Sequence, residues 1–438
     1  MKDYILFELK LISRSLRLKR LMTPLIFLIL SVYLMHIVSD RDFLVRIFFL
    51  YALISVPGAT YSQIIFAMEA SFIDKLLISP FSVYSILKAK YYLYCCFAFV
   101  MVVIMLPIML LDIKLSEILS SFFYTVGFVY FICFQNARFS AKEFDIKAVK
   151  YFNWQGYSFI TQHLIPLICL IVSMGIIVIT HQIFGENIAL IVMCITGISF
   201  VTGHKLWLMP IAKNFEKNLV KRCEQKDVLN IPQLSITNGE LLGIIGNTGA
   251  GKTTFSRLCL DFLPADEGQI FINNHNIHLS GEWKKYVSAF FNERFLIDFL
   301  TPKEYFYFSG NLYGLSKKEI DANLTDFKTF LGEEILDSKH LIDKFSKSDK
   351  QKIGIVAAII CRPRLLLLDE SFNCLDTISQ AQIKKLLLDC HLKYDMTVIL
   401  SSNNIQYITD FCNRFVVLDA SRILYDGSNI TDAINYIK

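Results

Sequence analysis

The chain has 438 residues, enough for two or three domains, of which 54% are hydrophobic and 19% charged, with a mean hydropathy of +0.46. The net charge of +5 gives no reason to expect a nucleic-acid partner, because the basic residues gather in the loops between apolar segments. The 11 cysteines include no C-x-x-C pair, which predicts reduced and mostly buried thiols.

The first twenty residues are basic and also carry regularly spaced apolar side chains. Six Lys/Arg alternate there with Leu6, Leu9, Ile12 and Leu16. The pattern predicts that residues 1–20 form a basic amphipathic helix in the membrane interface. A charge cluster that only sets the topology explains the same residues equally well. No small-residue cleavage site follows, so we expect a retained anchor and not a signal peptide.

Six apolar segments of membrane-spanning length follow within residues 21–204. They cover 21–38, 44–66, 91–111, 118–134, 159–180 and 187–202. Several are close to the minimum length for crossing about 30 Å of hydrocarbon. Six such segments without amphipathic periodicity are better explained by a bilayer than by the buried helices of a soluble protein. The sequence therefore predicts an all-α membrane domain with six spans, in contact with the lipid bilayer.

The charges of the loops predict how these spans are oriented. Basic residues are concentrated in the N-terminal segment, the second loop and the fourth loop, whereas the other three loops hold two Lys/Arg between them. By the positive-inside rule, both termini and the C-terminal half are cytoplasmic, in a multi-pass protein of the inner (plasma) membrane. The second loop, residues 68–89, and the fourth loop, with Phe152 and Trp154, are candidates to contact the C-terminal half. The alternative for each is a solvated loop.

A connector over residues 205–224 leads to a C-terminal domain, residues 225–438, that contains a phosphate-binding motif. Gly-x-x-x-x-Gly-Lys-Thr directly follows an apolar stretch of strand length, residues 241–245. In such a loop the backbone N–H groups surround the β-phosphate, Lys252 reaches the β/γ oxygens and the Thr253 hydroxyl ligates Mg²⁺. The predicted nucleotide-binding residues are Gly246, Asn247, Thr248, Gly249, Ala250, Gly251, Lys252, Thr253 and Thr254.

Short apolar runs alternate with helical stretches in this domain, as in a parallel sheet. The predicted strands are 241–245, 364–368, 397–400 and 415–418. The second of them leads into Asp369 and Glu370. Asp369 then lies at the tip of the sheet, where it can hold Mg²⁺ or its water, and Glu370 lies beside the γ-phosphate as the candidate base for the attacking water. We therefore expect ATP and Mg²⁺ as cofactors.

Three further segments complete a resemblance to the ATP-binding cassette (ABC) family over the whole C-terminal half. Residues 267–270 resemble the turn after the first helix, residues 345–352 fall where the family signature belongs, and residues 373–376 resemble the loop that senses the dimer partner. The resemblance implies an α/β P-loop NTPase fold of the ABC ATPase type. It also implies a dimer in which each ATP lies between one phosphate loop and the other signature. The residues that would complete this site are Ser346, Lys347, Ser348 and Asp376.

Four features depart from the pattern of that family. Ser348 stands at the second signature glycine, where its Cβ crowds a close backbone approach. Asn292 stands for the glutamine that links Mg²⁺ and water to the membrane domain, and Asn403 for the switch histidine, which unlike Asn can carry a proton. No aromatic residue lies between Lys221 and Gly239 to stack on adenine. We expect ATP binding with slow hydrolysis, either from a slow but working ATPase or from a heterodimer in which this signature impairs one of two sites.

The N-terminal half is similar to the compact permeases of type-two ABC exporters. It also looks like an uncharacterised bacterial permease family, through residues 66–73, 88–92 and 135–138. A permease and a cassette in one chain imply a half-transporter that pairs with a second copy or a related half-transporter, and hence an ATP-driven exporter. The alternative is a membrane-anchored ATP-binding regulatory or partner subunit with little hydrolysis or transport of its own. Nothing in the sequence identifies the transported substrate.

Overall fold

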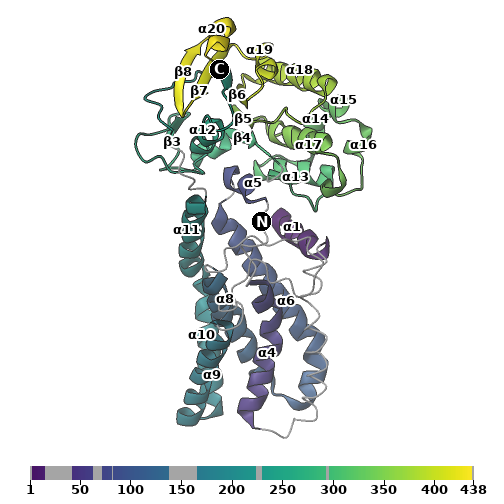
Figure 1. The fold of residues 1–438 in the computed structure, drawn as a ribbon. Coiled ribbons are helices and arrows are strands. Elements are labelled where there is room, and N and C mark those ends of the chain that lie inside the picture. Colours follow the sequence, from purple (N-terminus) through teal and green to yellow (C-terminus); the bar gives the residue numbers. More distant parts are fainter. Residues whose placement is uncertain are drawn as a thin grey trace. The chain divides into compact units, whose positions relative to one another are not determined.

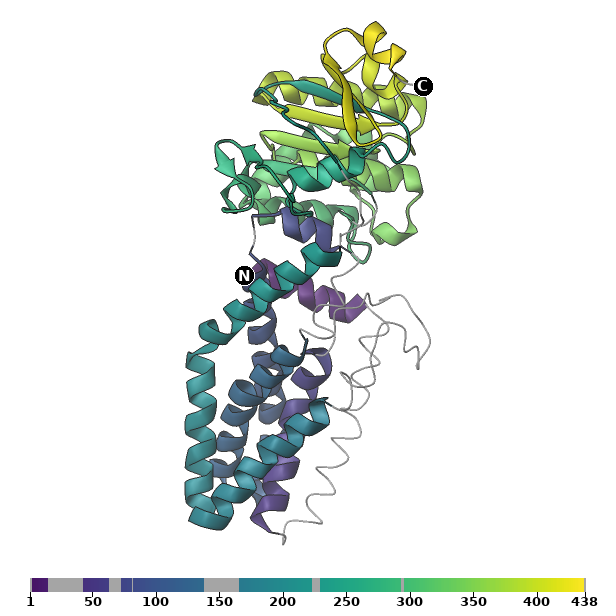
Figure 2. The ribbon, with the colours of Figure 1, turned by 60° about the vertical axis from the view of Figure 1, so that its left-hand side comes forward.

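The computed structural model describes residues 2–14, 42–62, 72–80, 82–137, 165–222, 229–292 and 295–436. Contacts divide the chain into two compact units. The first comprises Met1–Ser71 and Val83–Glu216, and the second comprises Phe72–Ser82 and Lys217–Lys438. Figures 1 and 2 show the elements of each unit from two sides.

Some predicted features lie outside the described residues. These are the first span (21–38), the ends of the second and fifth spans (63–66 and 159–164), the fourth loop with Phe152 and Trp154, and the start of the C-terminal domain (225–228).

The first unit is helical throughout the part that the structure describes. Its elements are α1 (Lys2–Arg14), α4 (Phe43–Ser62), α6 (Val83–Asp112), α7 (Leu115–Tyr124), the π-helical turn η1 (Thr125–Val129), α8 (Tyr130–Ala137), α9 (Ile165–Phe184), α10 (Glu186–Thr202) and α11 (His204–Arg222). Helix α1 buries Tyr4, Phe7 and Leu11, and its Glu8 forms a buried ion pair with Lys90 of α6, with the two charged atoms 2.8 Å apart. The prediction of a helix is confirmed for Lys2–Arg14, but the packed face is not the predicted one, because Leu6 and Leu9 are 48% and 39% exposed.

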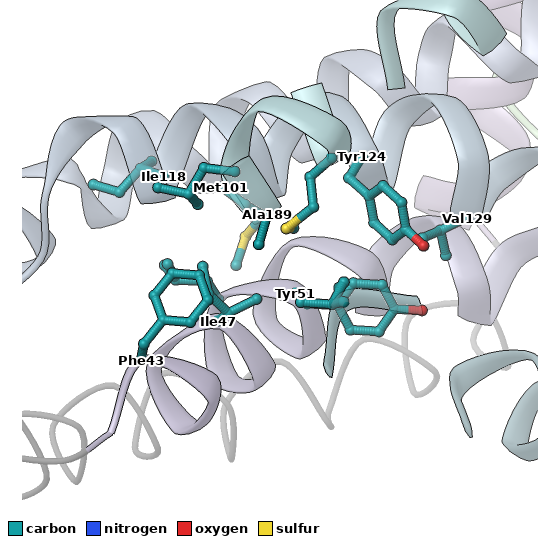
Figure 3. Packing of buried hydrophobic residues seen from close by; sticks show 12 residues of the cluster. Phe43, Ile47, Tyr51, Met101, Ile118, Tyr124, Val129 and Ala189 are labelled. Atoms are coloured by element: carbon teal, nitrogen blue, oxygen red, sulfur yellow. The ribbon is translucent and has the colours of Figure 1, made fainter. Parts of the chain in front are cut away.

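A core of apolar side chains lies between these helices. Phe43, Ile47, Leu50 and Tyr51 recur at helical spacing on one face of α4, and none is more than 3% exposed. They pack with Met101, Ile118, Tyr124, Val129, Ile177, Ala189, Leu190 and Met193 from the other helices (Figure 3). Apolar side chains also cover the outside of the unit. Ile179, Ile183, Ile191 and Ile195 on α9 and α10 are 55–65% exposed, as in helices that are apolar all round.

Two helices in the described residues are long and apolar enough to cross a membrane. They cover Val83–Val103 and Leu115–Gln135. A third is counted if Glu186–Thr202 and His204–Lys213, which are bent by 53° at their junction, form one broken span. Met174–Phe184 is a shorter apolar helix. The prediction of a helical N-terminal region is confirmed, with two to three candidate spans in this part of the chain, and the prediction of six spans stays a prediction.

The second unit is built on a six-stranded sheet with the order β4-β5-β6-β1-β7-β8. Its strands are β1 (Leu241–Ile245), β4 (Val287–Phe290), β5 (Leu365–Asp369), β6 (Thr397–Ser402), β7 (Arg414–Asp419) and β8 (Arg422–Gly427). All neighbouring pairs are parallel except β7 and β8, which form an antiparallel hairpin. A two-stranded hairpin of β2 (Phe271–Ile272) and β3 (His275–Asn276) lies outside this sheet. The four predicted strands and their parallel arrangement are confirmed, and β4 and β8 are additional strands.

Helices connect the parallel strands, as the right-handed βαβ arrangement requires. Those of at least eight residues are α12 (Lys252–Cys259), α13 (Pro302–Leu312), α14 (Lys317–Thr325), α17 (Lys347–Ile359) and α18 (Thr377–Tyr394). Shorter ones are α15 (Lys328–Leu331), α16 (Glu333–Leu336), α19 (Gln406–Thr409) and α20 (Ile430–Asn435), with 3₁₀ turns at Glu282–Lys285 and Ile342–Lys344. The central strands are buried on both faces, since every residue of β1 and β6 is buried.

Part of the second predicted loop belongs to the second unit. The short helix α5 (Ile73–Ile78) follows Phe72, whose ring lies 5.8 Å from that of Phe299. The amine of Lys75, which is 1% exposed, donates to the carbonyl of Ala357 in α17 at 3.5 Å. The predicted contact of this loop with the C-terminal half is therefore confirmed for residues 72–80.

Candidate nucleotide-binding site

The predicted phosphate loop links β1 to α12 and is shaped by three glycines. Gly249 and Gly251 have φ angles of +85° and +102°, a region that side chains with a Cβ rarely adopt. A Cβ on Gly246 would lie 2.3 Å from the carbonyl oxygen of Leu418 in the neighbouring strand β7. The N–H of Ala250 closes the turn onto the carbonyl of Asn247 at 3.1 Å. The spacing of glycines in the sequence is thus required by this backbone, which leaves a cradle at the N-terminus of α12.

Lys252 lies at the centre of this loop. Its side chain is 5% exposed, and its amine donates to the carbonyls of Gly246 at 2.8 Å and Asn247 at 3.1 Å. The same amine lies 3.3 Å from Oε1 of Glu370. The loop therefore holds a positive charge where the β/γ-phosphates of a nucleotide would bind.

Two oxygen-bearing side chains suited to Mg²⁺ meet beside the loop. The Thr253 hydroxyl at the start of α12 donates to Oδ2 of Asp369 at the end of β5, at 2.7 Å. The Ser401 hydroxyl of β6 donates to Oδ1 of the same carboxylate. Burial raises the pKa of the Asp369 carboxyl, and the hydrogen bonds from Ser401 and Thr253 oppose that shift. A cation at this position would stabilise the ionised carboxylate.

This donor set fits magnesium bound together with a nucleotide. No group of three or more His, Cys, Asp or Glu that could hold a metal by itself occurs among the described residues. Mg²⁺ usually binds through one or two protein oxygens and completes its shell with phosphate oxygens and waters. Thr253 and Asp369 supply such a pair, so the site suits a magnesium–nucleotide complex better than a metal held by protein ligands alone.

Glu370 directly follows β5 in an unusual backbone conformation. Its φ angle is +49°, which is unfavourable for a residue with a Cβ. Its N–H donates to the carbonyl of Ser401 at 3.1 Å, and its carboxylate pairs with Lys252 and accepts from Nδ2 of Asn373 at 2.8 Å. Residues strained in this way are common at functional sites. The structure brings Glu370, Asp369, Lys252 and Thr253 together, as the sequence predicts.

Asn292 and Asn403 lie at the same edge of the sheet. Asn292 follows β4 and Asn403 follows β6, and both of these strands pair in parallel with β5. Both side chains are exposed. Because carboxyl ends of parallel strands share one edge, the two residues flank the end of β5 that carries Asp369. Their roles stay predictions.

The signature segment and Asp376 cap helices. The Ser346 hydroxyl accepts from the N–H of Asp349 at 3.1 Å and donates to Oδ2 of Asp349 at 2.7 Å, so it is the N-cap of α17. Lys347 and Ser348 are then the first two helical residues. Asp376 caps α18 through the N–H of Ser379 at 2.9 Å, and its hydrogen bonds with Ser379 lower its pKa. These hydrogen bonds of Ser346 and Asp376 thus join each side chain to the residue three positions further along the chain.

Three residues that contact the predicted site residues were not identified from the sequence. Ser401 binds Asp369, Asn373 binds Glu370, and Asp349 binds Ser346. Ser401 follows the predicted strand 397–400, so the pairing of that strand with the one that ends at Asp369 was a signal for it. Asn373 is an exposed loop residue, and its spacing gives no separate signal. Asp349 follows Ser346 by three residues, and this Ser-x-x-Asp pattern before an apolar run was a signal for their contact.

A strand, glycine loop and helix beside a second strand that ends in Asp-Glu are typical of the P-loop NTPase fold. Residues 229–373 match the ABC transporter family, so the C-terminal half is an ABC ATPase domain. The chain as a whole belongs to the family of unknown function DUF5687, whose model matches residues 1–224, just over half of the 438 residues.

Curated relatives match in the C-terminal half. The chain is 28% identical over 224 residues to methionine import ATP-binding protein MetN 1 of Staphylococcus aureus strain USA300, covering 50% of this chain and 64% of that protein. The protein of the same name from strain MRSA252 is 27% identical over 222 residues, covering 49% and 64%. The chain thus spans less than two thirds of the length of these relatives.

Solved structures are similar over the same half. One, an ATP-binding subunit of an ABC transporter, has 25% identity and a TM-score of 0.43, covering 48% of this chain and 87% of the other. Another, a dimeric ATP-binding cassette in a post-hydrolysis state bound to ADP and Pi, has 24% identity and a TM-score of 0.41, covering 46% and 90%.

Proposed function

We propose that this protein binds and hydrolyses ATP to drive the movement of a substrate across a membrane. The observation that carries the proposal is the cluster of Lys252, Thr253, Asp369 and Glu370 at the N-terminus of α12. In the same chain, a helical region holds two to three candidate membrane spans. A cluster of this kind suits phosphoryl transfer, and the apolar helices would form the membrane part that ATP hydrolysis drives.

The proposed chemistry assigns each residue one task. The N–H groups of the phosphate loop and the amine of Lys252 hold the β/γ-phosphates. Thr253 and Asp369 hold Mg²⁺, which when bound stabilises the charge on the transferred phosphoryl group. Glu370 takes a proton from the attacking water. Asn292 links Mg²⁺ and that water, and Asn403 donates a hydrogen bond to a phosphate oxygen.

The proposed assembly is a dimer of two copies or of this chain with a related half-transporter. In it, Ser346, Lys347, Ser348 and Asp376 of one cassette would complete the ATP site of the other. The N-terminal half would be a six-span permease in the inner (plasma) membrane, with both termini and the ATPase domain in the cytoplasm. Export is the proposed direction, on the resemblance of the helical half to type-two exporter permeases. The names of the curated relatives describe import by those proteins.

Turnover of the full-length protein in lipid tests this proposal. Lys252→Ala should lower ATP hydrolysis by about tenfold or more, because the variant lacks the positive charge that contacts the phosphates. Glu370→Gln should lower it by about a hundredfold or more, because the base is lost. Leu392→Ala, at a side chain that is 79% exposed, is the control and should hydrolyse ATP like the unmodified protein. Hydrolysis that survives both site variants would reject the proposal.

A second candidate function is a regulatory or partner subunit that binds ATP and hydrolyses little of it. The contact of Asp349 with Ser346 favours it, because an acidic side chain already bonds the signature serine. ATP binding without turnover, measured on the same samples together with the oligomeric state, would support this candidate. Release of a substrate from vesicles that contain only this chain would reject it.

A further inference from the structure

The carboxylate of Glu370 contacts two different groups. Its Oε1 lies 3.3 Å from the amine of Lys252, and its Oε2 accepts from the amide of Asn373 at 2.8 Å. The Glu370 side chain is 27% exposed, so it is neither in open solvent nor fully buried. Each oxygen therefore has its own partner, an ion pair for Oε1 and a hydrogen bond for Oε2.

Lys252 already interacts with three oxygen atoms. Its amine donates to the carbonyls of Gly246 and Asn247 and forms an ion pair with Oε1 of Glu370 at 3.3 Å. Of these three partners, only Glu370 is an anion. A phosphate that binds this amine competes with Glu370 for its positive charge, and the two anions repel each other, so Glu370 is the partner that the phosphate displaces.

Asn373 lies in a turn that several hydrogen bonds stabilise. Its N–H lies 3.4 Å from the carbonyl of Glu370, and the N–H of Leu375 donates to the carbonyl of Phe372 at 3.1 Å. The side-chain amide of Gln380 donates to the carbonyl of Leu375 in the same turn at 2.7 Å. The turn is anchored to the sheet by the hydroxyl of Ser371, which donates to the carbonyl of Phe290 at 2.8 Å. The Asn373 amide is thus presented to Glu370 by a fixed backbone.

We propose that Asn373 is a positioning residue that holds Glu370 on Lys252 until ATP displaces it. The inference rests on the proposed ATP-binding function and adds to it an internal competitor for the phosphate. By stabilising the Lys252–Glu370 pair, Asn373 weakens ATP binding. After the phosphates of ATP bind the Lys252 amine, the hydrogen bond from Asn373 keeps the released Glu370 carboxylate beside the phosphate loop.

The test measures ATP affinity of the full-length protein in lipid, with EDTA present to prevent turnover. Asn373→Ala should tighten ATP binding by about twofold to twelvefold, the effect of losing one net hydrogen bond of about 0.5–1.5 kcal/mol that favours the Lys252–Glu370 pair. Glu370→Ala should also tighten it. Asn373→Ala added to Glu370→Ala should bring no further change, because the residue acts only through Glu370.

The outcomes separate the inference from the proposed function. Unchanged affinity in Asn373→Ala, or an equal gain with and without Glu370, would overturn the inference while leaving ATP binding in place. A loss of kcat in Asn373→Ala at unchanged affinity would also overturn it, because Asn373 would then act on hydrolysis alone. If neither the unmodified protein nor any variant binds ATP, the proposed function fails and the inference fails with it.

Discussion

At the residue scale, an acidic side chain sits in the segment where the family resemblance implies contact with a phosphate. Asp349 occupies the first turn of α17 and bonds the Ser346 hydroxyl through both its N–H and its carboxylate. A carboxylate in a first helical turn is favourable for the helix, because it meets the positive end of the helix dipole. The same charge repels an anion that approaches this helix end. Helix stability and phosphate binding therefore make opposite demands on this position.

Removing the charge of Asp349 should raise ATP turnover. Asn at this position keeps an acceptor for the helix end, and we expect Asp349→Asn to raise kcat/KM by about fivefold, the effect of about 1 kcal/mol of repulsion between charges 4 Å apart in water. Steady-state hydrolysis in lipid at low and high salt measures this, and the gain should shrink at high salt. Asp349→Glu keeps the charge and is the control. Equal rates for all three proteins would show that this helix end does not meet the phosphate.

At the element scale, a close approach of two helices in the first unit depends on two glycines. A Cβ on Gly197 of α10 would lie 2.3 Å from the backbone carbonyl of Phe123 in α7, and one on Gly127 would lie 2.1 Å from the carbonyl oxygen of Gly197. Gly127 belongs to the π-helical turn η1, where the helical backbone widens. The two helices are therefore in direct backbone contact, as small residues permit in packed membrane helices.

A methyl group at this crossing should separate the helices. Gly197→Ala should lower the thermal stability of the purified protein in detergent, because overpacking costs about 1–3 kcal/mol. Gly175→Ala in α9 is the matched control, since a Cβ there has no atom within 4 Å, and it should be neutral or slightly stabilising. Thermal melting curves of the two variants, recorded beside that of the unmodified protein, measure the difference. Equal melting temperatures for the two variants would contradict the close backbone contact.

At the scale of the whole molecule, a segment from between two helices of the first unit is built into the second. Residue Lys75 of α5 is 1% exposed, and burial lowers the pKa of its amine, with the nearby Cys361 thiol opposing the shift. Its amine has the Ala357 carbonyl as a partner at 3.5 Å. A lowered pKa in the folded state means that the unfolded chain binds the proton more tightly. The free energy of unfolding therefore rises with pH between the folded pKa and the usual lysine value.

Replacing Lys75 with an apolar side chain of similar length should stabilise the protein at neutral pH. Lys75→Met removes the cost of burying a charge and keeps the packing of the stem. We expect a higher melting temperature for Lys75→Met at pH 7 and a smaller difference from the unmodified protein at pH 9.5. Lys303→Met, at an exposed lysine of α13, is the control and should show no such dependence on pH. A stability difference that is constant between the two pH values would show that the Lys75 charge is not buried.

The contiguous motifs were predictable because local chemistry fixes them. Residues 246–254 follow a buried strand, and their glycines are required by the backbone of the loop, so the sequence alone predicted where this loop lies. Its binding of phosphate stays a prediction. The strand that ends in Asp369 was predictable too, because a run of apolar residues precedes the two carboxylates. The short strand β4 and the hairpin strand β8 could not, because alternating or brief apolar runs at a sheet edge differ little from loops.

Features that join distant parts of the chain were decided by the tertiary structure. The bond from Ser401 to Asp369 exists because β6 pairs with β5. The burial of Lys75 exists because α5 packs against β4 and its Lys75 contacts Ala357 of α17. The apolar composition of the first unit by itself determined that its chain forms helices. The close crossing at Gly197 depends on which helices become neighbours, and sequence spacing carries no information about that choice, because backbone contact is made across the packed interface.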